Sequence, residues 1–240
     1  MKKLIGKMDY TLLDPKATEE EIVSLCKKAH ELGVKSVCVR PNMVNIAKKA
    51  LFKSDVLVCT VVSFPEGTNW TRDKLTETKK CIADGADEID MVLNWALFFP
   101  ESLGVNIPYL VNDVETLVEE CHRHTNKDGD KITLKVIVES GMLNEQQTIV
   151  ATNICLEGGA DFIKTSTGYA PNKIGAELNK VKIMKKLIND AQSNMKIKAS
   201  GGIRTIEDVK MYEPYVDRFG IGFAAVDKML GEENLTSDSY

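Results

Sequence analysis

Short apolar runs alternate along this chain with longer stretches in which apolar residues recur at helical spacing. The short runs are typical of β-strands, and the longer stretches predict amphipathic helices between them. The predicted strands are residues 8–13, 36–39, 57–62, 88–93, 133–139, 162–165, 196–199 and 218–220.

Several of the predicted helices begin at recognisable capping residues. Thr18 followed by Glu21 forms a capping box, and Gly33 ends the helix that starts there. The same reasoning predicts later helix starts at the pairs Asn112 and Glu115, Asn144 and Gln147, and Thr205 and Asp208. Strands and helices therefore alternate over the whole chain.

Eight strands, each followed by space for a helix, predict a parallel sheet that closes into a (β/α)8 TIM barrel. We expect a single α/β domain over residues 1–240, in which residues 231–240 form a flexible polar tail. The alternative is an open doubly wound sheet. It is less favoured because no Gly-x-Gly-x-x-Gly motif follows the first strand.

A weak internal repeat relates three of the helix-to-strand connections. The stretches "ELGVKSVCV", "ADGADEIDMV" and "EGGADFIKTS" each pass from a glycine into a strand. Cys38, Asp90 and Lys164 stand at the same offset after that glycine. Equal offsets predict that all three side chains point into the barrel.

Composition and charge narrow the class of protein. The chain is 43% hydrophobic and 28% charged, with a net charge of −4, which gives no reason to expect a nucleic-acid partner. We recognise no signal peptide and no apolar run long enough for a membrane span. The six cysteines form no Cys-x-x-Cys pair, so we interpret them as reduced thiols of a cytoplasmic protein. We expect no metal site.

Two lysines on neighbouring strands carry the predicted chemistry. Period-2 alternation lets Lys164 and Lys198 both face the barrel interior. Two ammonium groups about 4 Å apart repel by roughly 4 kcal/mol at an effective dielectric of 20, which could lower the pKa of one lysine by about three units. One lysine is then a nucleophile and the other its activator, and the residues alone leave open which is which. Asp90 would transfer protons, or alternatively serve only as a counter-ion.

Glycines at the ends of the last strands predict a phosphate site. They let backbone amides approach an anion closely, and such barrels commonly hold phosphate at the loops after their last strands. The expected ligand is a small phosphorylated sugar. The candidate residues are Thr167, Gly168, Gly201, Gly202, Gly220 and Gly222.

The sequence resembles the deoxyribose-phosphate aldolase family from near Asp9 to near Leu230. The resemblance rests on "MDYTLLDP", "SVCVRP", "GADEIDMVLN", "LKVIVESGML", "GADFIKTSTG", "KASGGIRT" and "RFGIG". In this order these stretches are very specific. The resemblance implies a homo-oligomeric (dimeric or tetrameric) enzyme without a cofactor. It would reversibly cleave 2-deoxy-D-ribose 5-phosphate to D-glyceraldehyde 3-phosphate and acetaldehyde.

The same resemblance implies a role for individual residues. Lys164 would form the Schiff base, Lys198 would perturb it, and Asp90 would relay protons. The residues that would line the pocket are Asp9, Thr11, Cys38 and Lys135. The terminal Tyr240 either assists proton transfer, as in some members, or is a disordered end.

The chain departs from the family pattern where phosphate is expected to bind. Ile221, Gly222 and Phe223 follow the strand-eight glycine where many members have small hydroxyl residues, and Tyr169 stands where some members place a lysine. "SFPEG" at 63–67 also departs from the usual stretch, and an irregular segment at 94–111 either shapes the pocket or is a surface insertion. Two alternatives follow: an aldolase for an unphosphorylated aldehyde, or a non-catalytic scaffold protein.

Overall fold

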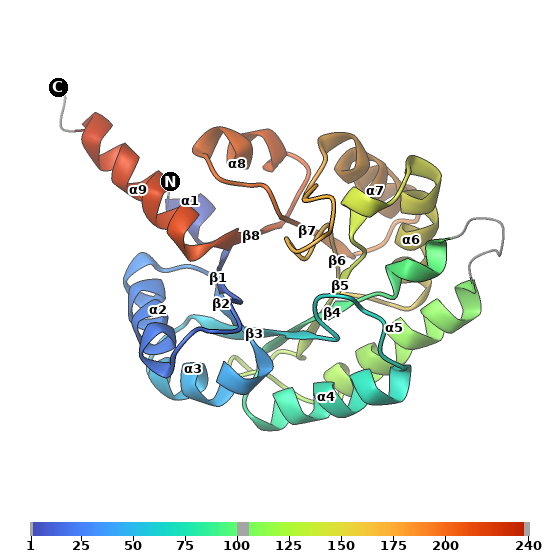
Figure 1. The fold of residues 1–240 in the computed structure, drawn as a ribbon, viewed down its shortest axis with the longest axis horizontal. Coiled ribbons are helices and arrows are strands. Elements are labelled where there is room, and N and C mark those ends of the chain that lie inside the picture. The colour runs from blue at the N-terminus through green and yellow to red at the C-terminus, as the bar shows by residue number, and fades with distance from the viewer. Residues whose placement is uncertain (1, 100–105, 238–240) are drawn as a thin grey trace.

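In a computed structural model of the protein, which describes residues 2–99 and 106–237, the chain forms a closed parallel barrel. The strands follow one another around the barrel in the order β1 to β8, and each pairs with its sequence neighbours. Figure 1 shows the helices as a ring outside the strands. The predicted single-domain (β/α)8 fold is therefore confirmed.

The eight strands lie where the sequence predicts them, with ends that differ by at most two residues. They are β1 (Met8–Leu12), β2 (Ser36–Val39), β3 (Leu57–Val62), β4 (Glu88–Val92), β5 (Thr133–Ile137), β6 (Phe162–Lys164), β7 (Lys196–Ser200) and β8 (Arg218–Gly222).

The helices occupy the stretches between the strands. They are α1 (Lys2–Ile5), α2 (Glu19–Leu32), α3 (Val44–Ala50), α4 (Thr71–Ala83), α5 (Ile107–His122), α6 (Glu145–Glu157), α7 (Leu178–Asp190), α8 (Ile206–Tyr212) and α9 (Phe223–Ser237). Short 3-10 turns lie at Pro41–Met43, Trp95–Phe98 and Ser140–Met142. None of the described helices is both long enough and apolar enough to cross a bilayer.

Three of the four predicted capping pairs are confirmed. The boxes at Thr18, Asn144 and Thr205 form, and Gly33 ends α2 at a φ of 69°. The prediction at Asn112 is wrong, because α5 begins earlier, at Ile107, and Asn112 lies within it. Asn106 caps that helix by accepting from the backbone of Tyr109, and a proline in the first turn suits a helix start.

Two segments without a predicted strand or helix contain regular structure. The segment 94–111 contains a 3-10 turn and the first turn of α5, while residues 100–105 lie outside the described part. The predicted tail starts at residue 231, inside α9, which continues to Ser237. Tyr240 lies outside the described residues.

The register of the strands determines which side chains share the barrel interior. Lys164 on β6 is the Cα partner of Lys198 on β7, and Asp90 on β4 is the partner of Lys135 on β5. Partners across parallel strands point to the same side, so these four side chains lie together inside the barrel. The alternate residues, such as Ile163, pack outward into the apolar core under the helices.

Candidate active site

Seven charged side chains meet inside the barrel, and all of them are buried. Each comes from an inward position of a strand. They are Asp9, Glu88, Asp90, Lys135, Lys164, Lys198 and Arg218. Burial on this scale is costly unless the charges are paired, so the contacts among them decide what the site can do.

Asp90 lies at the centre of the network. Its Oδ2 accepts hydrogen bonds from Lys164 Nζ and from Lys198 Nζ, both at 2.7 Å. Its Oδ1 accepts from Lys135 Nζ at 3.0 Å and from the Cys59 thiol at 3.2 Å. The two predicted lysines therefore share one carboxylate oxygen.

A second group of contacts lies beside this centre. Lys135 also donates to Glu88 at 2.8 Å, and Arg218 donates to Glu88 at 2.6 Å and to Asp9 at 2.7 Å. Asp9 also pairs with Lys198. Each of these carboxylates thus bonds to two cationic side chains.

The pKa shifts follow from burial and from this pairing. Burial alone would lower the pKa of Lys198, but the carboxylates of Asp9 and Asp90 outweigh it and raise that pKa above its ordinary value. Burial alone would likewise raise the pKa of Asp90, but Lys135, Lys164 and Lys198 hold it well below its usual range. Lys198 is therefore an ammonium group, and the expected mutual repulsion of two bare lysines is offset by the carboxylate between them.

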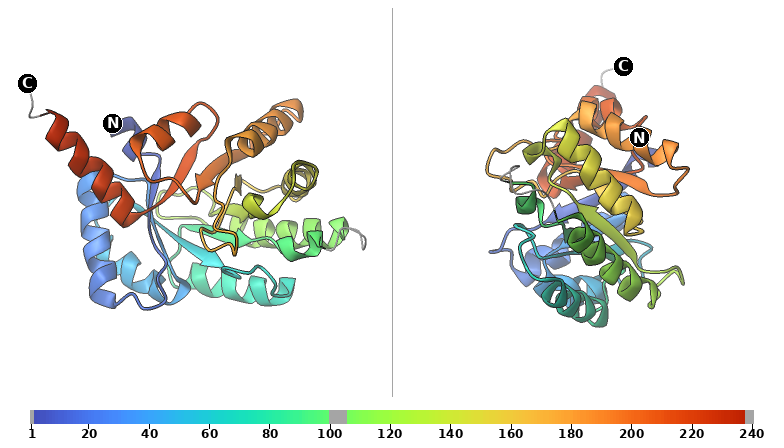
Figure 2. Two further views of the ribbon diagram at one scale, coloured as in Figure 1. Left: turned by 45° about the horizontal axis from the view of Figure 1, so that its top comes forward. Right: turned by 90° about the vertical axis from the view of Figure 1, so that its right-hand side faces the viewer.

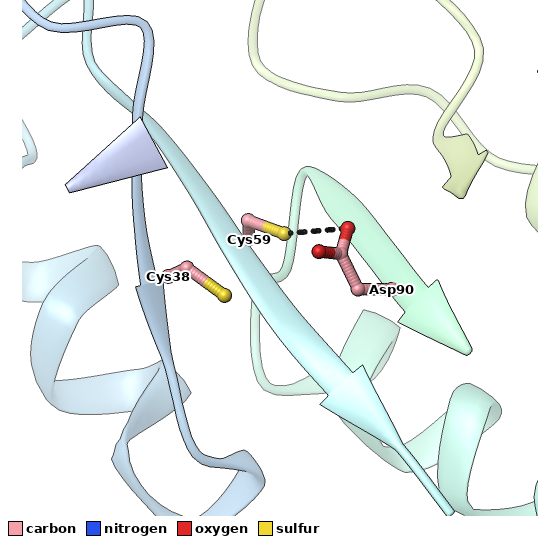
Figure 3. A group of neighbouring side chains, drawn as sticks. All are labelled: Cys38, Cys59 and Asp90. Carbon is pink, nitrogen blue, oxygen red and sulfur yellow. Dashed lines mark hydrogen bonds between the residues drawn. The ribbon is translucent and has the colours of Figure 1, made fainter. Parts of the chain in front are cut away.

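Two cysteines complete the centre on the side of β2 and β3. Cys38 and Cys59 are Cα partners and fully buried, and Figure 3 shows the Cys59 thiol directed at Asp90. The neighbouring Cys59 lowers the pKa of the Cys38 thiol, whereas burial raises that of Cys59. The predicted inward direction of Cys38 is confirmed.

Metal ligation is possible only at a cost to this network. The sets Cys38, Cys59, Asp90 and Asp9, Cys59, Glu88 bring donor atoms within 4.8 Å of one another. Every carboxylate in them already bonds to cationic side chains. A metal ion would have to displace those cations, so the arrangement suits an ion-pair network better than a metal centre.

A cavity of about 510 Å³ opens above the network at the carboxyl ends of the strands. Of the three network lysines, Lys164 is the one that lines it, with 4% of its surface exposed against 0% for Lys135 and Lys198. The other predicted residues along its wall are Thr11, Thr167, Gly168, Gly201, Gly202, Gly220 and Gly222.

Three residues that the family resemblance placed in the pocket lie deeper. Asp9, Cys38 and Lys135 are fully buried and do not line the cavity. They contact the groups beneath its floor instead, as Lys135 does at Asp90. At this depth the three residues can influence the charge of the site, but they do not form part of the wall that a ligand would touch.

One end of the cavity is built mainly from backbone. Gly201 and Gly202 take φ values of 81° and 80°, a left-handed conformation that glycine adopts without strain. The first residues of α9 form the adjoining wall, and Arg204 contributes a cationic side chain. Backbone amides at a helix start and a guanidinium are suited to an anion.

Glu139 holds the loop after β6 in place. It has a φ of 51° and is buried, and its carboxylate accepts hydrogen bonds from the Ser166 and Thr167 hydroxyls and from the Thr167 amide. The loop follows Lys164 directly, so this carboxylate fixes the wall beside the candidate nucleophile.

Sequence reasoning missed four side chains of the candidate site: Cys59, Glu88, Glu139 and Arg218. Two of them carried a usable signal. Glu88 stands two residues before Asp90 on the same strand, so the period of two already turns it inward. Cys59 occupies the inward position next to Cys38. No comparable local pattern marks Glu139, which follows the end of β5.

Comparison with known proteins gives a consistent result. Residues 4–213 match the family model described as "DeoC/LacD family aldolase". The chain is 45% identical to the deoxyribose-phosphate aldolase of Mycoplasmoides gallisepticum over 89% of this chain and 88% of that one. It is 42% identical to that of Caldanaerobacter subterraneus subsp. tengcongensis over 90% and 88%. The tetrameric deoxyribose phosphate aldolase from Aeropyrum pernix superimposes with a TM-score of 0.80 at 28% identity, over 98% of this chain and 92% of that one.

Proposed function

This chain belongs to the DeoC/LacD family of aldolases, and from that premise we propose that it reversibly cleaves 2-deoxy-D-ribose 5-phosphate. The products are D-glyceraldehyde 3-phosphate and acetaldehyde, and the reaction passes through a Schiff base on Lys164. The observation that carries the proposal is that Lys164 alone among the network lysines lines the cavity while it bonds to Asp90.

The charge of the network supports Lys164 as the reacting amine. The seven described side chains comprise four cationic groups and three carboxylates when all hold their ordinary charge. A buried excess charge is unfavourable, so the number of carboxylates that each cation contacts matters. Lys198 contacts Asp9 and Asp90, and Lys135 contacts Glu88 and Asp90. Lys164 contacts Asp90 alone among these carboxylates and faces the cavity, so it is the lysine placed to attack a carbonyl group.

Asp90 is well placed to move protons after the attack. Its Oδ2 is within hydrogen-bond distance of both lysines, so a proton can pass between the carbinolamine on Lys164 and the Lys198–Asp90 pair. Loss of water then gives an iminium that withdraws electrons from the bond to be cleaved. The low pKa of Asp90 keeps it ionised at rest, as a proton acceptor must be.

The substrate's phosphate would lie against the glycine loops and the start of α9. This end of the cavity offers backbone amides of Gly202, Gly222 and Phe223 and the side chain of Arg204. A phosphate there leaves the aldehyde end of the sugar directed at Lys164.

A second candidate substrate is an unphosphorylated aldehyde. It is favoured by Ile221, Gly222 and Phe223, which offer no side-chain hydroxyl to an anion. Comparing turnover of 2-deoxyribose with and without the 5-phosphate separates the two. A non-catalytic scaffold is disfavoured, because it has no use for a buried cationic excess beneath an open cavity.

Covalent trapping tests the proposed mechanism. Borohydride added with acetaldehyde should leave one ethyl group on Lys164, which intact-mass and peptide mass spectrometry would locate. Lys164→Ala should abolish the adduct, whereas Lys196→Ala, on the exposed start of β7, should not. A folded wild-type sample without an adduct contradicts the proposal.

We also propose a homo-oligomer in a reducing compartment, the cytoplasm. The support is the tetrameric relative and the six cysteines, which are all unpaired. Light scattering of the purified protein tests the oligomeric state.

A further inference from the structure

The wall of the cavity at the start of α9 has no hydroxyl side chain. α9 follows β8 without a connecting loop, and residues 222–225 (Gly-Phe-Ala-Ala) line the cavity. An anion at this wall can contact only backbone amides, whose positions are those of the helix itself. Whatever fixes the first turn of α9 therefore fixes this part of the anion site.

Tyr10 on β1 contacts α9 in two ways. Its hydroxyl donates to Asp227 Oδ1 at 2.6 Å, and its ring meets the Phe223 ring edge-on with centroids 6.2 Å apart. Tyr10 is 1% exposed and points outward from the barrel, away from the catalytic network. It is therefore not part of the reacting centre.

Lys28 on α2 holds the other oxygen of the same carboxylate. Its Nζ lies 2.7 Å from Asp227 Oδ2, so Asp227 joins α9 to both β1 and α2. These side chains line a separate pocket of about 250 Å³, and Leu12 and Phe223 line both this pocket and the active-site cavity. Phe223 thus lies between the two.

The apolar contacts of α9 are not directional. Val226 and Met229 are buried against the barrel, but such contacts do not fix the rotation or axial position of a helix as hydrogen bonds do. Figures 1 and 2 show that the far end of α9 extends beyond the other helices. The polar anchors near the first turn therefore matter more here than they would for a helix packed along its whole length.

We propose that Tyr10, Asp227 and Lys28 are positioning residues that fix the first turn of α9 as an anion-binding wall and so set the preference for phosphorylated over unphosphorylated substrate. The inference rests on the proposed function in one respect, that the anion is the substrate's 5-phosphate. A displacement of about 1 Å is enough to weaken a geometrically demanding interaction strongly.

Tyr10→Phe is the most direct test, because it keeps the ring contact with Phe223 and removes the hydroxyl. We expect KM for 2-deoxyribose 5-phosphate to rise about ten-fold, which corresponds to about 1.4 kcal/mol. The kcat for that substrate, and kcat/KM for 2-deoxyribose, should stay within about two-fold of wild type. Lys28→Gln should raise the same KM by about three-fold, since the Tyr10 bond remains.

Lys186→Gln is the matched control, because it breaks an exposed helix-surface pair with Asp190 on α7 and should change neither substrate's kinetics. An unchanged KM in Tyr10→Phe would overturn the proposal. A parallel loss of kcat with both sugars would overturn it too, because that result indicates a general structural role.

Binding of inorganic phosphate, measured by titration calorimetry, separates this proposal from the proposed function. We expect Tyr10→Phe to weaken phosphate binding about ten-fold relative to wild type. If the wild-type protein turns over neither sugar but Tyr10→Phe still weakens phosphate binding, the proposed function fails and the positioning role stands. Equal phosphate affinity in both proteins refutes the positioning role.

Discussion

Replacing Asp90 by asparagine tests the central part of the site. Asp90 accepts from Lys164, Lys198 and Lys135, and an amide offers one oxygen and two unwanted donors in their place. Lys198 keeps Asp9 and Lys135 keeps Glu88, whereas Lys164 loses the carboxylate that it contacts. The perturbation therefore falls mainly on the cavity lysine.

The expected loss of stability is large. Breaking a buried ion pair by removing one partner costs about 3–5 kcal/mol, and denaturant unfolding would measure it. Asp113→Asn is a matched control, because Asp113 forms an equally buried ion pair with Lys74, with an N–O distance of 2.6 Å. This pair does not line the cavity. Both variants should lose stability to a similar extent, and the control should keep its turnover.

The catalytic rate distinguishes Asp90→Asn from Asp113→Asn. Removing a general acid–base group lowers kcat by about 10²- to 10⁴-fold, and we expect that loss in Asp90→Asn. Lys164 still lines the cavity in this variant, so the borohydride adduct with acetaldehyde should still form. A kcat within about ten-fold of wild type, or loss of the adduct in folded protein, would refute this reasoning.

Three further predictions follow from the same geometry. The charged neighbours of Asp9 and Glu88 depress the pKa of both carboxyls. The stability that the two carboxylates contribute is therefore present above about pH 4 and lost as the pH falls further. Urea unfolding at several pH values measures this loss. Gly201→Ala should lower the free energy of unfolding by about 1–2 kcal/mol and raise KM for the phosphorylated sugar, because its φ is 81° and its Cβ would lie 3.0 Å from Gly175. Arg204→Gln should raise KM for the phosphorylated sugar by about ten-fold and leave that for 2-deoxyribose unchanged, as steady-state kinetics would show.

The sequence predicted the positions of the central residues well, because a period of two decides the direction of a strand side chain. Lys164, Lys198 and Asp90 all point inward as expected. The ion-pair partners of the buried charged residues could not be predicted in the same way. Asp9 and Arg218 meet across a sequence separation of 209 residues only because the barrel closes between β1 and β8.

The charge state of the lysines could not be predicted from the sequence for a related reason. Repulsion between the two lysines was expected to act on one of them, and nothing in the sequence indicated that the pKa of the other, Lys198, is raised. The sequence placed Asp90 inside the barrel without showing that one of its oxygens lies between both amines. A pKa depends on such distances steeply, so the sign of the shift required coordinates.

The network divides into a part that joins strands and a part that faces the cavity. Arg218 bonds to both Asp9 and Glu88 and so ties β1, β4 and β8 together, away from the cavity lining. Around Asp90, one carboxylate oxygen accepts from two lysines, and of these Lys164 lines the cavity. Removing Arg218 should therefore affect mainly folding, whereas changes at Lys164 should remove chemistry and leave the barrel intact.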